Sequence, residues 1–244
     1  MAGRPSGILR LVSHVDLGVD LRYNAPHEKH SALSDPPNRT AIEPMSTRRA
    51  GSTAGQSFPR LETERLLLRK IVPSDAAALY AIFSDDEVTR YYDLGTMTNP
   101  ADAETMVRRL AARTKHGQAI RWGIVRKQDR AFVGTCGFHF QAAGFKAEIG
   151  YDLGREHWHQ GYMSEALRAM LAYGFETLEL NRIEALVMPE NEASANLLRK
   201  LGFSEEGVLR EYAFFKEEYH NLRFFSLLRR EADQTLGVLR PLGS

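Results

Sequence analysis

One stretch constrains the fold of this chain more than any other: residues 147–178, AEIGYDLGREHWHQGYMSEALRAMLAYGFETL. We interpret AEIGYDL as a strand and GREHWHQ as a short loop. From about Gly161 the apolar residues recur at the spacing of one buried helix face. The residues on this face are Met163, Leu167, Met170, Leu171, Gly174 and Leu178. The stretch therefore predicts a strand, a loop and a helix.

The start of this helix predicts an anion site. The backbone N–H groups of a first helical turn lack carbonyl partners, and here they belong to residues 159–164. They point in one direction, with the positive end of the helix dipole behind them. Gly161 has no Cβ that would block a close approach to the backbone. A strand, a tight loop and a helix N-terminus in this order indicate a site for a diphosphate.

The composition narrows the class of protein. The chain has 244 residues and a formal net charge of +1. This near balance of charge indicates neither a large basic surface that would bind nucleic acid nor a long acidic segment that would be disordered. The single cysteine, Cys136, allows no intramolecular disulfide, and we expect it to be a buried core thiol. No apolar run approaches the roughly 20 residues that span a bilayer. We therefore expect a cytoplasmic protein with no nucleic-acid or membrane partner.

The first 57 residues differ from the rest. They are rich in proline and glycine, and no helix or strand period persists in them, so residues 1–57 are predicted to be a disordered extension. Met45 is an alternative start for the native protein. We expect one domain over residues 58–232 and a frayed tail over residues 233–244.

The domain is predicted to be a mixed sheet with flanking helices. Helices are expected at residues 76–83, 85–93, 101–115, 161–178 and 191–202, and strands at residues 61–72, 119–127, 131–140, 147–153, 182–189, 204–215 and 221–231, with a turn at 216–220. The two strands on either side of the helix from Gly161 must be parallel because a helix separates them. The predicted fold class is α/β (α+β) with a mixed sheet.

Four of these stretches, in this order, resemble the GNAT superfamily of N-acetyltransferases, and within it the ribosomal-protein alanine and serine N-acetyltransferases (the RimJ/RimL-like branch). They are LETERLLLRKIVPSDAAALY, AEIGYDLGREHWHQGYMSEAL, RIEALVMPENEASANLLRKLGF and NLRFFSLLRRE. The resemblance covers about residues 61–231. It implies the acyl-CoA N-acyltransferase fold, whose mostly antiparallel sheet contains one splayed parallel strand pair.

The resemblance also implies an acetyl-CoA site with no metal. Acetyl-CoA would lie between the splayed strands 147–153 and 182–187, its pantetheine amides meeting the backbone of Tyr151, Asp152 and Leu153. The diphosphate would sit on the loop and first helical turn, and Asn191 would bond the pantetheine arm from the other wall. The residues of that loop and turn are Trp158, His159, Gln160, Gly161, Tyr162, Met163 and Ser164.

The chain departs from the superfamily pattern at three positions. His159 and Met163 are bulkier than the usual residues of the acetyl-CoA motif, and we expect their side chains to turn outward, since the backbone donors do not depend on them. Leu198 stands where many members have a tyrosine that protonates the leaving thiolate. In the resembling branch the serine of the N-x-x-S motif is the suggested acid, which here is Ser194.

For the general base we favour Glu148, because a carboxylate in the middle of a strand is unusual. The alternative is a solvated Glu148 or one paired with Arg121; Asp152 and His139 are weaker candidates for the base. Ser194 could instead bond the backbone at a helix start, and Asn191 could act as a helix cap.

Aromatic residues could bind the amine acceptor, and histidines could bind a metal. Several aromatic residues could line an acceptor cleft, although most are expected to lie in the core: Tyr91, Tyr92, Tyr212, Phe214, Phe215 and Tyr219. Of these, Tyr92 and Phe214 are predicted to line the cleft. The histidines near Glu156, namely His157 and His159, have poor spacing for chelation, so no metal site is expected.

The predicted function is direct transfer of acetyl from acetyl-CoA to a primary amine in a ternary complex. The acceptor is left open between a protein N-terminus, a polyamine, an amino acid and an aminoglycoside or other amine antibiotic. The alternative is a non-catalytic acyl-CoA-binding sensor or scaffold, which the leucine at position 198 would suit. Either a monomer or a homodimer is compatible with the sequence.

Overall fold

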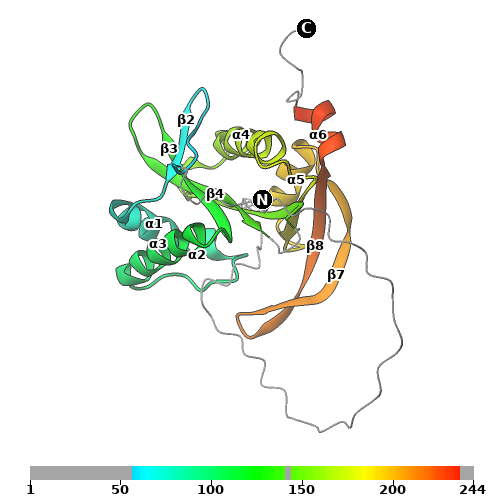
Figure 1. Cartoon of the computed structure of the whole chain (residues 1–244). Coiled ribbons are helices and arrows are strands. Elements are labelled where there is room, and N and C mark those ends of the chain that lie inside the picture. The colour runs from blue at the N-terminus through cyan, green and yellow to red at the C-terminus, as the bar shows by residue number, and fades with distance from the viewer. Residues whose placement is uncertain (1–56, 141–143, 237–244) are drawn as a thin grey trace, which may run out of the picture.

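The structure is a computed structural model that describes residues 57–140 and 144–236. The predicted N-terminal extension, apart from its last residue, and the end of the predicted tail (residues 237–244) lie outside the described residues. The described part forms an open eight-stranded sheet with helices on both faces (Figure 1).

The sheet has the strand order β1-β2-β3-β4-β5-β6-β8-β7. Neighbouring strands are antiparallel except for β5 and β6, which are parallel and are connected through α4. The strands are β1 (Leu61–Glu62), β2 (Leu66–Lys70), β3 (Ala119–Arg126), β4 (Phe132–Phe140), β5 (Lys146–Leu153), β6 (Arg182–Val187), β7 (Ser204–Phe215) and β8 (Glu218–Leu228). The predicted fold class, a mixed and mostly antiparallel sheet with one parallel pair, is confirmed.

The helices divide between the two faces. One face carries α4 and α5, and the other carries α1 and α3 (Figure 1). The helices are α1 (Ala76–Phe83), α2 (Asp86–Thr89), α3 (Pro100–Lys115), α4 (Tyr162–Glu176), α5 (Glu192–Lys200) and α6 (Arg229–Leu236), with short 3-10 turns at Pro73–Asp75 and Arg155–His157.

The two faces of the central strands differ in polarity. The face under α4 is apolar: Phe138 packs closely against Gly174 of α4, where an added Cβ would come within 2.7 Å of its ring. The opposite face, here called the polar face, carries Arg121, Thr135, His139, Glu148 and Asp152, all buried. Alternation along the strands separates the two sets, because successive side chains point to opposite faces. The buried charged side chains of the central strands therefore gather on one side of the sheet.

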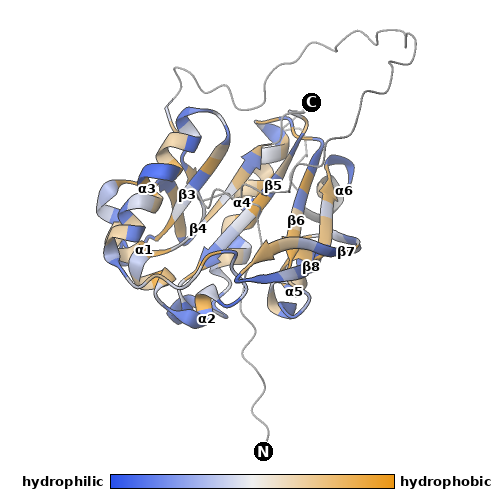
Figure 2. Cartoon of the chain, turned by 90° about the horizontal axis from the view of Figure 1, so that it is seen from below, coloured by the Kyte–Doolittle hydropathy of each residue, from blue (hydrophilic) through white to orange (hydrophobic). Residues whose placement is uncertain are grey.

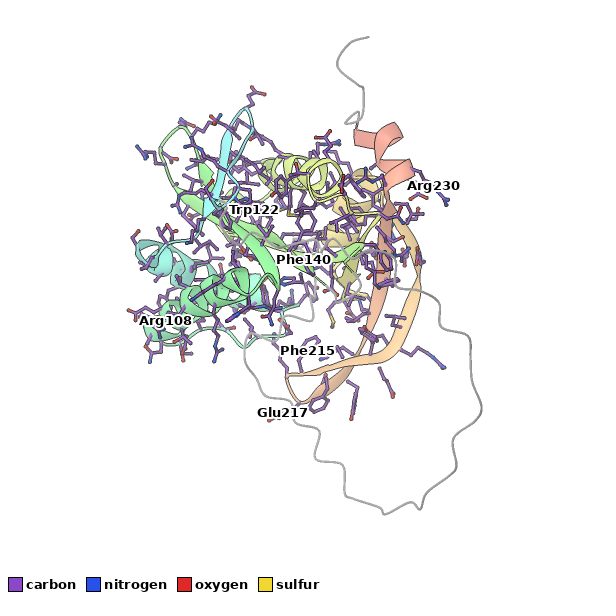
Figure 3. The ribbon with its side chains drawn as sticks, viewed as in Figure 1. Arg108, Trp122, Phe140, Phe215, Glu217 and Arg230 are labelled. Atoms are coloured by element: carbon purple, nitrogen blue, oxygen red, sulfur yellow. The ribbon has the colours of Figure 1, made fainter. Side chains whose placement is uncertain are left out.

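Strands β7 and β8 form a long hairpin, here called the arm, that bends across the sheet toward α2 (Figure 2). Its inner side packs an apolar cluster in which Leu186 of β6 meets Ala213, Phe215 and Leu222. At the tip, Lys216 Nζ donates to the carbonyl oxygens of Thr89 at 2.9 Å and Arg90 at 3.1 Å. Figure 3 shows Phe215 and Glu217 at this end of the arm. The arm is therefore anchored to the main body at both ends.

Several predicted boundaries were wrong, among them the helix expected at residues 85–93, which is the short α2 (Asp86–Thr89). The expected strand 61–72 is two short strands, β1 and β2, because the chain turns between them with Thr63 N–H bonded to Leu66 O at 3.0 Å. The last strand ends at Leu228, and α6 follows where the strand end and frayed tail were expected. The arm turn consists of Lys216 and Glu217, whose φ values of 50° and 65° suit a tight two-residue hairpin turn.

Candidate active site

The parallel strands β5 and β6 separate after a short contact. Three register pairs join them, from Lys146 opposite Arg182 to Glu148 opposite Glu184. Beyond Glu148, β5 continues to Leu153 paired with β4, while β6 continues paired with β8. The expected splay is therefore present, and it opens toward the carboxyl ends of both strands. Backbone groups along such an opening can pair with an extended ligand.

The loop after β5 leads directly to the N-terminus of α4. Gly161 is the residue before the helix and has a φ of +78°, a left-handed conformation that favours glycine. The first helical hydrogen bond runs from Glu165 N–H to Gly161 O at 3.1 Å, so the N–H groups of Tyr162, Met163 and Ser164 precede the bonded helix. The loop thus presents donors and the positive end of a helix of 15 residues beside the splay.

An ion pair between Arg65, in the turn between β1 and β2, and Glu165 of α4 stabilises this loop and is here called the brace. Arg65 Nε donates to Glu165 at 2.6 Å and its Nη1 donates to Gln160 O at 3.0 Å. Burial opposes ionisation of Glu165, yet hydrogen bonds from Thr63 and Arg65 outweigh it and lower the pKa of the carboxyl. The Arg65 guanidinium also lies 4.6 Å from the ring centre of Tyr162. No local sequence pattern predicts this brace, since 100 residues separate Arg65 and Glu165.

The side chains of the loop differ from expectation in one case. His159 turns outward, as expected, and is exposed with a φ of 60°. Met163 was expected to turn outward as well, but it is 1% exposed and packs in the core, because it lies on the apolar stripe of α4. Trp158 is buried and its Nε1 donates to Leu153 O at 2.8 Å. Gln160 Nε2 donates to Glu156 O at 2.8 Å and so holds the loop compact.

On the other wall of the splay, α5 brings a buried serine to β5. The hydroxyl groups of Ser194 and Tyr151 lie 2.8 Å apart, and both residues are fully buried. Asn191 caps α5, its side-chain oxygen accepting from Ser194 N–H at 3.1 Å. The expected cap is therefore present, and the Ser194 hydroxyl bonds a tyrosine. Leu198 is fully buried in the core.

On the polar face, Arg121, Thr135 and Asp152 form a buried cluster in which each side chain bonds the other two. Arg121 Nη2 lies 2.6 Å from Asp152, and Thr135 Oγ1 donates to the same carboxyl at 2.6 Å. The suggested pairing of Arg121 with Glu148 is wrong, because the strand register places Asp152 opposite Thr135, which Arg121 also bonds. Asp152 is 1% exposed and is held by these donors, so its carboxyl has a structural role in the cluster.

Glu148 lies at the point where the strands part, 9% exposed, with His139 opposite it on β4 and Glu184 opposite it on β6. Glu184 is bonded by Arg182 Nε at 2.7 Å and by Lys146 Nζ at 3.1 Å. Burial and then the negative charges of Glu148 and Glu184 raise the pKa of Tyr212, a residue of the arm. The arm therefore brings a phenol close to the two carboxylates.

The two residues predicted for an acceptor cleft come from different elements: Tyr92 follows α2, and Phe214 lies on β7 near the tip of the arm. Tyr92 is 3% exposed and its ring packs edge-on against Phe83 at 5.2 Å. Phe214 is 44% exposed and contacts the Tyr219 ring at 4.9 Å near the arm tip. Tyr212 was among the aromatic residues that could line this cleft, but Tyr92 and Phe214 were favoured over it. The strand register shifts between Leu209 and Ala213, on either side of Tyr212.

Cys136 is fully buried on β4. Burial raises the pKa of the Cys136 thiol to about 12, which confirms a core thiol. Within the described residues no group of three or more His, Cys, Asp or Glu side chains could hold a metal ion. Among the helices of that same part, none is long and apolar enough to cross a membrane.

A splayed parallel pair beside a helix N-terminus defines the acyltransferase class of folds, and the comparisons agree. A family model described as "Acetyltransferase (GNAT) domain" matches residues 65–204. The Bacillus subtilis uncharacterized N-acetyltransferase YoaA is 44% identical over 173 residues, which is 70% of this chain and 98% of YoaA. The Escherichia coli [ribosomal protein uS5]-alanine N-acetyltransferase is 27% identical, covering 66% of this chain and 87% of its own.

Solved structures show the same likeness. The Mycobacterium smegmatis RimJ structure, in complex with CoA-disulfide, has a TM-score of 0.64 and 27% identity, covering 70% of this chain and 85% of RimJ. The chain belongs to the GNAT family of acetyltransferases. It is an N-acetyltransferase, and its relatives include ribosomal-protein N-acetyltransferases.

Proposed function

We propose that the protein transfers acetyl from acetyl-CoA directly to a primary amine in a ternary complex. The observation that carries this proposal is the splay of β5 and β6 beside the N-terminus of α4. The pantetheine arm would pair with the backbone of Tyr151, Asp152 and Leu153, with Asn191 on the opposite wall. The diphosphate would bind the N–H groups of residues 159–164, between Trp158 and the first turn of α4. The relative with bound CoA-disulfide supports this assignment.

Glu148 is the proposed general base. It lies on the polar face at the last register pair before the strands part, so it is close to where a thioester in the splay would meet an amine. The base removes the proton of the ammonium, and the neutral nitrogen attacks the acetyl carbonyl. A backbone N–H group of β5 polarises that carbonyl.

Ser194 is the proposed acid for the departing CoA thiolate. Its hydroxyl shares a hydrogen bond with the Tyr151 hydroxyl, so a proton given to the thiolate can be replaced from Tyr151. The second proton that the attacking nitrogen loses as the amide forms restores the proton of this pair. The fully buried Leu198 cannot supply this proton. The pair replaces the single tyrosine found at the position of Leu198 in many members of the superfamily.

The acceptor is proposed to be a protein N-terminus. The support is the uS5-alanine N-acetyltransferase among the relatives. Tyr212, whose pKa is raised by burial and by the charge of Glu148, is proposed to line the acceptor site together with Tyr92 and Phe214. An acceptor of this kind would place the enzyme in the cytoplasm. A peptide that begins with alanine is the first acceptor to test.

Calorimetry with Gly161→Glu tests the diphosphate site. Glutamate at a φ of +78° is strained, its Cβ would lie 3.4 Å from Arg65 Nη2, and its charge would repel an anion. We expect the Kd for acetyl-CoA to rise about a hundredfold or more, which corresponds to roughly 3 kcal/mol. Gly95→Glu is the control, because an added Cβ there meets nothing within 4 Å. An unchanged Kd in folded Gly161→Glu would place the diphosphate elsewhere.

A further inference from the structure

The outer half of the arm extends beyond the strand that pairs with it. Pairing between β6 and β8 ends at Val187 opposite Arg223, and the arm continues from there to its tip at residues 216–217 (Figure 2). Within the arm the register also shifts between Leu209 and Ala213. Such irregularities interrupt the hydrogen bonding between strands and bend them. The position of the outer half therefore depends on its side-chain contacts with the rest of the molecule.

A lysine at the tip makes one of these contacts. Lys216 Nζ donates to Thr89 O at 2.9 Å and to Arg90 O at 3.1 Å, at the carboxyl end of α2, and this contact is here called the latch. Carbonyl groups at the end of a helix lack intrahelical partners, and a lysine ammonium has three donors to offer them. The tip itself is well packed, because the rings of Phe215 and His220 stack at 3.9 Å.

The backbone at the tip indicates that Lys216 is not there to make the turn. Its φ is 50°, a left-handed conformation that is unfavourable for a side chain of this kind. Two-residue hairpin turns with positive φ favour asparagine and glycine. An unfavourable conformation of this sort is a reason to look for a function. The neighbouring Glu217, with a φ of 65°, has no side-chain hydrogen bond or ion pair among the described residues.

The latch joins the two elements that carry the residues proposed for the acceptor site. Thr89 O accepts from the Tyr92 N–H at 2.9 Å as well as from Lys216, so the two residues share one carbonyl group. On the arm, Tyr212 precedes Lys216 by four residues. Burial and then the negative charge of Glu148 raise the pKa of Tyr212. The latch thus connects the arm that carries Tyr212 to the segment that carries Tyr92.

We propose that Lys216, through the latch, holds the arm in the position in which Tyr212 and Tyr92 bind the acceptor beside Glu148. The inference rests on the proposed function, in which these residues form the acceptor site. Lys216 acts through the arm and is thus a positioning residue. Acetyl-CoA is proposed to bind the splay and the loop before α4, which the latch does not contact. Loss of the latch should therefore weaken binding of the acceptor and leave binding of acetyl-CoA unchanged.

The test compares KM for an alanine-initiated peptide, or for the amine that an acceptor panel identifies, with the Kd for acetyl-CoA. Lys216→Asn removes the ammonium but suits a positive φ, so the turn is preserved. We expect KM to rise about tenfold, the effect of losing hydrogen bonds from one charged donor, with an unchanged Kd. Lys216→Arg keeps a charged donor and should retain most of the wild-type affinity for the acceptor. Glu217→Asn changes the other turn residue in the same way and is the matched control.

Hydrogen exchange of the full chain measures the latch without turnover. We expect faster exchange of the arm amides between residues 209 and 222 in Lys216→Asn, and wild-type exchange in Glu217→Asn. Lys216→Gly, which also suits a positive φ, serves if Lys216→Asn fails to fold.

A wild-type KM in either folded variant that lacks the ammonium would overturn the positioning role and leave the proposed function standing. An equal rise of KM in Glu217→Asn would assign the effect to the turn and overturn it as well. A wild-type enzyme that acetylates no amine would overturn the proposed function, and the positioning role with it.

Discussion

Glu148 is the residue on which the chemistry of the proposed reaction depends. It is the last residue of β5 that pairs with β6, and it is buried between His139 and Glu184. Its rival on the same face, Asp152, is bound to Arg121 and Thr135 and so has a structural role. The two carboxylates are four residues apart in sequence, but only Glu148 stands at the opening of the splay.

Glu148→Gln is expected to lower kcat about a hundredfold, because general-base catalysis typically contributes 10²–10⁴-fold. The fall of kcat toward acid pH should also disappear, since glutamine has no carboxylate to protonate. Steady-state rates between about pH 5 and pH 9 give the profile, a range that brackets neutral pH. Glu218→Gln, at the exposed start of β8, is the control. A Glu148→Gln enzyme with the wild-type profile would exclude this residue as the base.

Asn191 has two possible roles that can be separated. Its side chain caps α5, and the proposed function adds a bond to pantetheine. Asn191→Asp keeps the cap, whereas Asn191→Ala removes it at a cost of about 1 kcal/mol, or roughly 2–4 °C in Tm. We expect Asn191→Asp to keep the wild-type Tm but to bind acetyl-CoA more weakly. Wild-type affinity in Asn191→Asp would leave only the capping role.

At the scale of elements, the arm is held to the sheet by ion pairs at its base. Arg182 of β6 donates to Glu206 of β7 from Nη1 at 2.8 Å and from Nη2 at 2.7 Å. Hydrogen bonds from Arg182 and then Ser226 lower the pKa of Glu206 from 4.5 to about 2. Glu206 is a partly exposed group, so solvent screening limits the stabilisation to about 0.2–1 kcal/mol.

This depressed pKa predicts how the arm responds to acid. A carboxyl whose pKa is lower in the folded state stabilises the fold fully above the unfolded pKa of 4.5, and this stabilisation is lost as the pH falls through about 2. Glu206→Gln should therefore lower the free energy of unfolding at pH 7 by about 0.2–1 kcal/mol and make no difference near pH 2. Urea denaturation at the two pH values measures this. An equal deficit at both would show that the loss is not electrostatic.

At the scale of the whole molecule, patterns within one segment were predicted well from the sequence. The 3.6-residue period of α4, the glycine before it and the cap at Asn191 are local signals, and the structure contains all three. The parallel pair followed from chain order alone. The splay came from the family resemblance, and the three-pair register confirms it.

Contacts between distant segments were not predictable in the same way. Which strand neighbour Arg121 bonds depends on register, and a shift of one residue moves every side chain to the other face. The brace between Arg65 and Glu165 and the hydroxyl pair of Ser194 and Tyr151 likewise join residues from separate elements. Helix α6 was missed because no glycine or proline separates it from β8.

Acetyl transfer itself is the most direct test of the account. The full chain is incubated with acetyl-CoA and with a panel that holds an alanine-initiated peptide, a serine-initiated peptide, spermidine, free amino acids and an aminoglycoside. Free thiol is measured over time, and mass spectrometry of the acceptor locates the acetyl group. We predict thiol release that requires an amine, with the acetyl group on the N-terminus of the alanine-initiated peptide. Tight acetyl-CoA binding without turnover of any amine would contradict the account.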